Sequence, residues 1–293
     1  MDSTATRALA PDPQVVANDV RRALSEDLGS GDVTADLLPA DSQASATVIT
    51  RENAVLAGRA WFDACFHALD PAIEIRWHID DGMQAAAGDT LCTLRGRARP
   101  MVSAERCALN FLQALSATAT VTAAHVAAVR GSHATILDTR KTLPGLRMAQ
   151  KYAVRCGGGS NHRIGLFDAM LIKENHIAAA GSLRAAVRAA RSRHPDLLLE
   201  VEVENFAELD AAIAAGVDRI MLDEFSLADV RRAVARVDGH VPLEVSGGVG
   251  LTELPALAAT GVDYISIGAL TKHIHAIDLS MRIAVGDAQI LPI

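Results

Sequence analysis

The chain has 293 residues, half of them hydrophobic, and carries a formal net charge of −7 at pH 7. This length and composition exclude a disordered chain and allow a large buried core in one or two domains. The acidic balance argues against general nucleic-acid binding, because DNA and RNA are themselves polyanions.

We expect neither a membrane segment nor a secretory signal. The first residues lack a basic start and an apolar run, and no later apolar run is long enough to cross a bilayer. The four cysteines are widely spaced and form no metal-binding pattern. We therefore expect a cytoplasmic protein with reduced thiols.

The first third of the chain mixes helix and strand patterns. Helical spacing of apolar residues predicts a helix over residues 13–28, and Asp32 is a candidate cap for the turn that follows. Alternating and β-branched residues predict strands with one helix among them, at 44–51, 54–58, 61–69 (the helix), 73–79 and 90–97. This order predicts an α+β sandwich domain over residues 1–115, which the tail 271–293 rejoins.

A helix is predicted over residues 103–114, with Ser103 as its N-cap. Arg106 lies in its first turn. Without other evidence, such an arginine is usually a solvated helix charge.

After Thr120 the pattern changes to strands that alternate with helices. The strand candidates are 134–138, 169–173, 197–204, 219–223, 243–246 and 264–268, and the helices between the later ones are 183–193, 207–215, 227–237 and 251–259. Such alternation predicts parallel strands joined by right-handed crossovers. Because six strands are fewer than eight, we predict an incomplete or irregular α/β barrel, TIM-like, over residues 116–270.

One stretch concentrates positive charge. Between Thr139 and Lys173 there are seven Lys or Arg side chains and one acid, Asp168, in a chain that is acidic as a whole. Confined positive charge indicates a small, highly anionic ligand. Arginine binds carboxylates and phosphates bidentately and lysine adds a compact charge, so the candidates are Arg140, Lys141, His162, Arg163 and Lys173.

The predicted strands end in polar or glycine-rich residues, as at the mouth of an α/β barrel. Ser246-Gly247-Gly248 and Ile267-Gly268-Ala269 suit a phosphate held by backbone N–H groups. Glu202 and Asp223 suit Mg²⁺ or sugar hydroxyls, although pairing with nearby basic groups is an equally good interpretation. Gly157-Gly158-Gly159 indicates either close backbone approach to a ligand or a tight turn.

Several familiar catalytic patterns are missing from the sequence. It contains no GxSxG elbow, HExxH motif, Walker loop or Cys/His zinc cluster. We therefore expect a site that positions anions and stabilises charge, and no covalent triad.

Taken together, eight motifs resemble the quinolinate phosphoribosyltransferase family, the decarboxylating nicotinate-nucleotide pyrophosphorylases. They are EDLGSGDVT from Glu26, LNFLQALSATAT from Leu109, DTRKTLPGLR from Asp138, KYAVRCGGGSNHRIGLFDAMLIKENHI from Lys151, EVEVENF from Glu200, MLDEF from Met221, EVSGGV from Glu244 and ISIGALTK from Ile265. The resemblance covers nearly the whole chain. Glu174, Glu224 and Ala117 depart from the family's usual Asp, Asn and Gly, which leaves the charge pattern intact.

The resemblance implies a reaction and roles for the candidate residues. Quinolinate and 5-phosphoribosyl 1-diphosphate would give nicotinate mononucleotide, CO₂ and pyrophosphate, with Mg²⁺ as cofactor. Lys141, Lys173, Glu202 and Asp223 would be catalytic, the last two also holding the metal and ribose hydroxyls. The substrate-binding set would comprise Arg106, Thr139, Arg140, Lys141, His162, Arg163, Lys173, Glu202, Asp223, Ser246, Gly247, Gly248, Ile267, Gly268 and Ala269.

Within that set, Arg106, Arg140, His162, Arg163 and Lys173 would hold the two carboxylates. In this family the arginine that matches Arg106 reaches the barrel mouth of a partner subunit. The resemblance therefore implies a homodimer with shared sites, and leaves further assembly open.

Three alternatives remain at this point. One is a related phosphoribosyltransferase that acts on another pyridine-type acid without decarboxylation. Another is a barrel aldolase in which Lys173 forms a Schiff base. The third is a non-enzymatic anion or nucleic-acid binder, which the overall acidity disfavours.

Overall fold

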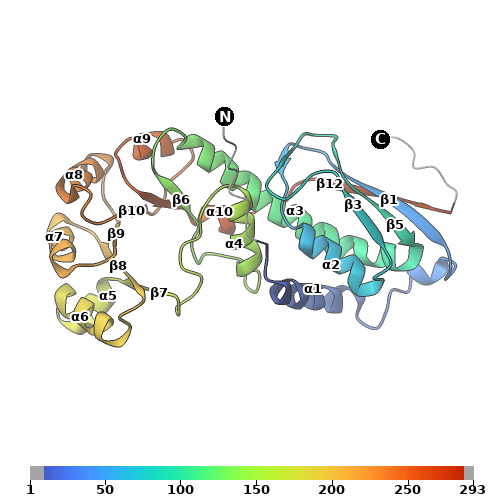
Figure 1. The fold of residues 1–293 in the computed structure, drawn as a ribbon, viewed down its shortest axis with the longest axis horizontal. Helices are drawn as coiled ribbons and strands as arrows, with labels where there is room; N and C mark the ends of the chain where they lie inside the picture. The colour runs from blue at the N-terminus through green and yellow to red at the C-terminus, as the bar shows by residue number, and fades with distance from the viewer. Residues whose placement is uncertain (1–9, 287–293) are drawn as a thin grey trace. The chain divides into compact units, whose positions relative to one another are not determined.

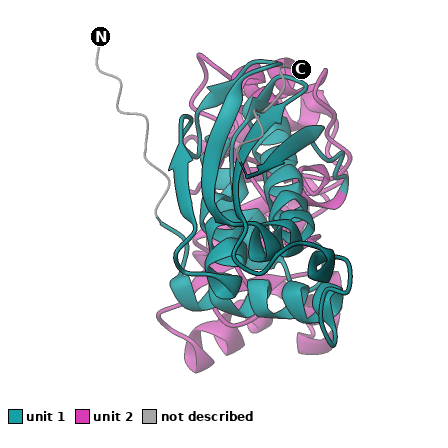
Figure 2. Ribbon diagram, turned by 90° about the vertical axis from the view of Figure 1, so that its right-hand side faces the viewer, with its two compact units in different colours: residues 1–123, 143–158, 273–293 teal, residues 124–142, 159–272 magenta. Residues whose placement is uncertain are grey.

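The structure is a computed structural model that describes residues 10–286 and separates into two compact units (Figures 1 and 2). Unit 1 takes in the chain up to residue 123, residues 143–158 and the chain from residue 273 onward; unit 2 takes in residues 124–142 and 159–272. The predicted boundaries at 115 and 270 do not include the excursion of residues 143–158 into unit 1. The four cysteines are buried and free, in line with the expected thiols.

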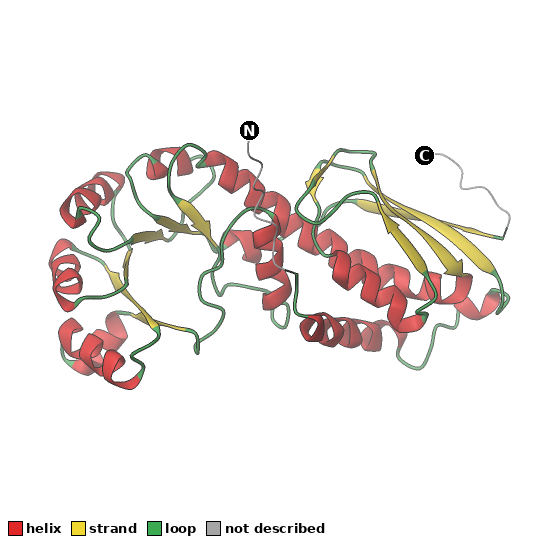
Figure 3. Cartoon of the chain, viewed as in Figure 1, coloured by secondary structure: helices red, strands yellow, loops and turns green. Residues whose placement is uncertain are grey.

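Unit 1 is an antiparallel sheet covered on one face by helices, so the predicted α+β layer is confirmed (Figure 3). The sheet order is β12-β1-β5-β3, and the core beneath it includes Trp61, Phe62 and Phe66. The elements are α1 (Pro13–Leu28), the 3-10 turn η1 (Ala35–Leu37), β1 (Gln43–Thr50), β2 (Ala54–Val55), α2 (Arg59–Leu69), β3 (Glu74–Trp77), β4 (Gln84–Ala85), β5 (Thr90–Arg97), α4 (Arg147–Cys156) and β12 (Leu279–Val285). The tail returns to this sheet, because β12 pairs with β1 in antiparallel register.

Helix α3 (Ala98–Ala128) has 31 residues and is much longer than the predicted helix 103–114. Ser103 is therefore not an N-cap. The helix follows β5 without a loop, and Pro100 is tolerated because the N–H groups of a first turn have no partner within the helix. The Ser103 hydroxyl instead donates to Asp32 Oδ2 at 2.8 Å.

Asp32 has the capping role expected of it. Its Oδ1 accepts from the backbone N–H groups of Thr34 and Ala35, both at 3.0 Å. These hydrogen bonds, with the Ala35 N–H first and the Ser103 hydroxyl second, lower the pKa of Asp32. Asp32 thus ties the turn after α1 to the first turns of α3, close in sequence to Arg106.

By length and composition, α3 passes the test for a membrane-crossing helix, contrary to our expectation that no segment would. Its most apolar 18-residue window is 61% buried inside the protein. Burial of that kind is typical of the core helix of a globular domain, so the composition of α3 is weak evidence for a membrane segment.

Unit 2 is an incomplete α/β barrel, as predicted. Its six strands are parallel and follow the order β6-β11-β10-β9-β8-β7. The elements are β6 (Thr135–Leu137), β7 (Ala169–Ile172), α5 (Glu174–Ala180), α6 (Leu183–Arg193), β8 (Leu198–Val203), α7 (Phe206–Ala215), β9 (Arg219–Leu222), α8 (Leu227–Val237), β10 (Leu243–Ser246), α9 (Leu254–Ala258), β11 (Tyr264–Ser266) and α10 (Ala269–Lys272). The short helices α5 and α10, like α4 in unit 1, were not predicted.

Strand β8 shows how the barrel separates apolar from charged side chains. Leu199, Val201 and Val203 are fully buried. Because side chains alternate along a strand, Glu200 and Glu202 point to the face of the sheet opposite these three residues. Helices lie along one face of this sheet (Figure 3). The inside of the curved sheet therefore receives charged groups.

The triglycine segment serves helix packing and a turn. A Cβ on Gly157 would lie 2.4 Å from the carbonyl oxygen of Ala119 and 2.6 Å from Cβ of Thr122. Gly158 follows with φ of +84°, a conformation that favours glycine. At Gly157 the close approach is therefore between the end of α4 and α3, and Gly158 makes the turn.

We predict that Gly157→Ala lowers the free energy of unfolding by about 1–3 kcal/mol, because the new methyl group meets rigid helix backbone. Chemical denaturation would measure the loss. The matched control is Gly250→Ala, whose Cβ would meet only the end of the Glu253 side chain at 3.4 Å. Equal stability of the two variants would contradict this explanation of Gly157.

Candidate active site

Polar side chains gather at the carboxyl ends of the parallel strands of unit 2. Asp138 follows β6, Lys173 follows β7, Asp223 follows β9, and Glu202 lies near the end of β8. The backbone joins two of these ends directly, since the Asp223 N–H donates to the Val203 carbonyl oxygen at 3.0 Å. In an α/β barrel this edge is where active sites form.

Lys173 and Glu202 form an ion pair across neighbouring strands. Lys173 Nζ contacts Glu202 Oε2, and the side chains are 43% and 9% exposed. The Lys173 backbone is fixed as well, because its N–H donates to Nδ1 of His176 at 3.0 Å in the first turn of α5. The lysine is therefore positioned at both ends while part of it remains open to solvent.

Asp138 organises the segment that carries His162 and Arg163. It is fully buried. Its carboxylate accepts from Asn161 Nδ2 at 2.6 Å and from the His162 N–H at 2.9 Å. The Ser160 N–H donates to the Ile136 carbonyl oxygen at 2.9 Å, so this segment runs beside β6. Asp138 was not a predicted site residue, and its role is to hold the residues that were.

The charge of Arg140 acts on the guanidinium of Arg163. Burial, and after it the charge of Arg140, lower the pKa of the Arg163 guanidinium. Arg163 Nη1 donates to the Ala169 carbonyl oxygen at 3.3 Å. Arginines placed near each other in this way suit a ligand with more than one negative charge, because guanidinium groups bind carboxylates bidentately.

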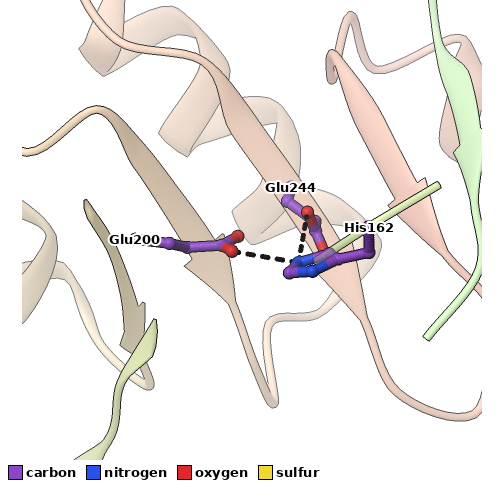
Figure 4. A group of neighbouring side chains, drawn as sticks. All are labelled: His162, Glu200 and Glu244. Atoms are coloured by element: carbon purple, nitrogen blue, oxygen red, sulfur yellow. Dashed lines mark ion pairs between the residues drawn. The ribbon is translucent and has the colours of Figure 1, made fainter. Parts of the chain in front are cut away.

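His162 lies between two buried carboxylates, Glu200 and Glu244, which come from β8 and β10 (Figure 4). Its Nε2 is 3.0 Å from Glu200 Oε2 and 3.4 Å from Glu244 Oε2. Burial alone lowers the pKa of His162, but the two carboxylates outweigh it and raise that pKa to about 9. Glu200 and Glu244 were not predicted as site residues. The alternation of glutamate and valine in the sequence EVEVE from Glu200 is the signal that would have pointed to Glu200.

The two carboxylates differ in their surroundings. Burial raises the pKa of Glu200. Burial acts on Glu244 in the same direction, but His162, Ser266 and Arg219 together lower its pKa. Arg219 Nη1 lies 3.1 Å from Glu244 Oε2, and its guanidinium stacks 4.1 Å from the centre of the Tyr264 ring. Glu244 therefore has both His162 and Arg219 beside it, whereas Glu200 is paired mainly with His162.

Glycines bring backbone close to the predicted catalytic side chains. A Cβ on Gly268 would lie 2.8 Å from Lys141 Cδ and 3.3 Å from Thr139 Oγ1. A Cβ on Gly247 would lie 3.2 Å from Asp223 Oδ1. The turns after β10 and β11 thus approach Lys141 and Asp223, and Gly247 and Gly248 take φ of +96° and +58°.

The remaining predicted site residues are placed as follows. Ser246 ends β10, Ile267 is buried directly after β11, and Ala269 begins α10. Thr139 accepts from the Lys141 N–H at 3.1 Å, and the Lys141 carbonyl oxygen accepts from the Thr271 hydroxyl at 2.9 Å. Arg106 is exposed on α3, in unit 1.

Comparisons with known proteins agree over most of the chain. The family models for the N-terminal and C-terminal domains of quinolinate phosphoribosyl transferase match residues 32–116 and 118–282. A nicotinate-nucleotide pyrophosphorylase (carboxylating) of Mycobacterium leprae is 44% identical, covering 89% of this chain and 95% of its own length. A quinolinate phosphoribosyltransferase (decarboxylating) of Nicotiana tabacum is 38% identical, with coverages of 90% and 81%.

A solved structure supports the same likeness. The nicotinate-nucleotide pyrophosphorylase of Francisella tularensis has 47% sequence identity and a TM-score of 0.91, covering 94% of this chain and 98% of its own. The likeness therefore extends from the sequence to the fold of nearly the whole chain.

We predict that Asp138→Ala lowers the free energy of unfolding by about 2–4 kcal/mol, because it leaves the half-buried donors of Asn161 and His162 without this acceptor. Asp138→Asn keeps one carbonyl acceptor and should lose less. Hydrogen exchange at the His162 amide would measure the local effect. Unchanged protection of that amide in Asp138→Ala would contradict the role of Asp138.

Proposed function

The chain belongs to the quinolinate phosphoribosyltransferase family, and from that membership we propose roles for the residues at the barrel mouth. The activity is phosphoribosyl transfer from 5-phosphoribosyl 1-diphosphate to quinolinate with decarboxylation, a step of pyridine nucleotide biosynthesis. The words carboxylating and decarboxylating in the relatives' names describe this reaction in its two directions. Neither the Lys173 aldolase nor a transferase that retains the carboxylate fits this family.

Arg140, Arg163 and Lys173 form the proposed diacid site, with His162 at its edge. The observation that carries this proposal is that these residues follow neighbouring elements at one edge of the barrel: Arg140 comes after β6, Lys173 follows β7, and Arg163 contacts the Ala169 carbonyl oxygen at the start of β7. The charge of Arg140 also acts on Arg163 and, after burial, lowers its pKa. Quinolinate has two carboxylates on neighbouring ring atoms. Guanidinium groups match carboxylates bidentately, so a dianion would offset the repulsion between the two arginines.

The phosphorylated substrate is assigned to the turns after β10 and β11. Ser246, Gly247 and Gly248 in one turn, and Ile267, Gly268 and Ala269 in the other, would hold its phosphate through backbone N–H groups. Thr139 and Lys141 lie beside Gly268, where Lys141 would face the diphosphate.

Mg²⁺ is proposed as the cofactor, with Glu202 and Asp223 as its protein ligands. Glu202 lies near the end of β8, and Asp223 follows the neighbouring strand β9. Mg²⁺ prefers one or two carboxylates together with water and substrate phosphates. The residues therefore fit the ion, although Lys173 also contacts Glu202. When bound, the metal would neutralise charge on the diphosphate.

The chemistry asks for little proton transfer from the protein. The pyridine nitrogen already has a free lone pair, so no general base has to act before it bonds to the ribose carbon and pyrophosphate leaves. Loss of CO₂ then leaves an electron pair on the ring carbon beside the new cationic nitrogen, and that carbon takes up a proton. Fixed cations such as Lys141 and Lys173 would stabilise the departing pyrophosphate and the ring charge, at roughly several kcal/mol for a well-placed group.

Arg106 is proposed to complete the site of a second copy of this chain, which makes the protein a homodimer with shared sites. An exposed arginine of this kind can reach across an interface and bind a substrate carboxylate in the site of the other copy. A cytoplasmic location also stays a prediction, because the plant relatives include mitochondrial forms.

The proposed roles are tested by incubating the protein with quinolinate, 5-phosphoribosyl 1-diphosphate and Mg²⁺ and following nicotinate mononucleotide. We expect product with Mg²⁺ and none after chelation. Arg140→Ala and Arg163→Ala should raise KM for quinolinate roughly tenfold or more, since each removes a charged hydrogen-bond donor.

KM for 5-phosphoribosyl 1-diphosphate should change much less in both variants. An equal increase in the two KM values would contradict the assignment of these arginines to the diacid.

Sharing of the site is tested by mixing two inactive variants, Arg106→Ala and Lys173→Ala. If Arg106 acts in the partner's site, each mixed dimer holds one intact site, and an equal mixture should regain roughly a quarter of wild-type activity after subunit exchange. Each variant alone is the control. No recovery, despite exchange shown by differently sized tags, would contradict a shared site.

A further inference from the structure

Glu200 and Glu244 have no part in the roles proposed so far, yet both lie against His162, the neighbour in sequence of Arg163 at the proposed diacid site. They are 1% and 0% exposed. They come from strands on either side of β9, and both point at the same ring nitrogen of His162 (Figure 4). A buried carboxylate is costly unless charge or hydrogen bonds compensate it, so a pair of them on one imidazole calls for an explanation.

One explanation is a metal ion, because the ligand atoms of His162, Glu200 and Glu244 all lie within 4.8 Å of one another. The other edge of the imidazole argues against it. The Arg163 backbone N–H donates to Nδ1 of His162 at 2.7 Å, so Nδ1 presents its lone pair. A metal on Nε2 would move the proton of the neutral ring to Nδ1, against that N–H donor, whereas metal-bound histidines normally donate from the free nitrogen to an acceptor.

The contacts of Nε2 with the two carboxylates can be explained without a metal, although Glu200 Oε1 and Glu244 Oε1 make no hydrogen bond. The carboxylates raise the pKa of His162, but a second proton on Nδ1 would face the Arg163 N–H donor. The geometry therefore favours a ring whose single proton is on Nε2, between the two carboxylates and nearer to Glu200. Arg219, stacked on Tyr264, is the positive group next to Glu244 and donates to it. Both carboxylates contact Nε2 and the Arg163 N–H contacts Nδ1, so the imidazole ring is held at both nitrogens.

We infer that Glu200 and Glu244 are positioning residues that clamp the His162 ring and, through its contact with the Arg163 N–H, set the backbone of Arg163 at the diacid site. The inference rests on the proposed function of that site. Asp138 holds the same segment from the other side through the His162 N–H. Together these three carboxylates restrain two consecutive residues, so they would lower the cost of ordering the segment when a diacid binds.

The test is Glu200→Gln, which keeps the size of the side chain and removes its charge. We expect KM for quinolinate to rise roughly fivefold to fiftyfold, with KM for 5-phosphoribosyl 1-diphosphate changing less than about twofold. Glu200→Asp, which keeps the charge but withdraws it by one methylene, should restore part of the loss. If Glu200→Gln does not fold, the comparison of Glu200→Asp with the wild type carries the same prediction.

Asp218→Asn is the matched control. Asp218 is another carboxylate of this barrel, which accepts from the Leu199 N–H at 2.6 Å and pairs with Arg191. Its loss should reduce stability and leave both KM values unchanged. A Glu200→Gln variant that behaves in the same way, or that raises both KM values equally, would overturn the inference.

Two further measurements test the clamp without following quinolinate turnover. Metal analysis of the purified protein should find no tightly held transition metal that is lost in Glu200→Gln, and a stoichiometric metal would overturn the clamp.

Nitrogen-15 NMR should show a protonated, exchange-protected Nε2 on His162 in the wild type and weaker protection in Glu200→Gln. An inactive wild type with this resonance intact would refute the proposed function and leave the clamp standing; an unprotected Nε2 would refute the clamp.

Discussion

The barrel depends on the interaction between fixed carboxylates and the basic residues that they pair with or hold in position. A cluster of basic side chains cannot be held at one mouth without fixed negative charge nearby, because the cations repel one another and each must be oriented. Glu202 contacts Lys173, and Asp138 holds the segment that carries Arg163. In each case the carboxylate is more buried than the group it holds, so the mouth stays cationic while the inside of the barrel is balanced.

The sequence was sufficient for the order of the barrel strands and for the residues at their ends. Buried parallel strands appear as short apolar runs, and a charged residue that closes such a run is conspicuous, as at Lys173 and Asp223. The start of α3 was missed because β5 enters it without a loop, so no capping residue marks the boundary. Helix α4 was missed because it has only ten residues and begins after Leu146, which provides no side-chain cap.

Glu200 and Glu244 show a different limit. A glutamate in the middle of a strand has the same letter whether it faces solvent or the inside of a barrel, and only the three-dimensional pairing of strands reveals which. The glycines show the same limit of prediction from sequence. Gly157 lets α4 approach α3, whereas Gly268 lies against the side chain of Lys141. Their sequence context alone did not separate the two roles.

The pairing of β12 with β1 has a consequence for biosynthesis. β1 is translated early, and β12 is the last strand of the described chain. The sheet of unit 1 therefore lacks its edge strand β12 until the whole barrel has been translated. The barrel of the middle segment has all its strands available before that edge emerges. A nascent chain halted before β12 would therefore expose the backbone hydrogen-bonding groups of β1, a surface to which chaperones and aggregation-prone strands both bind.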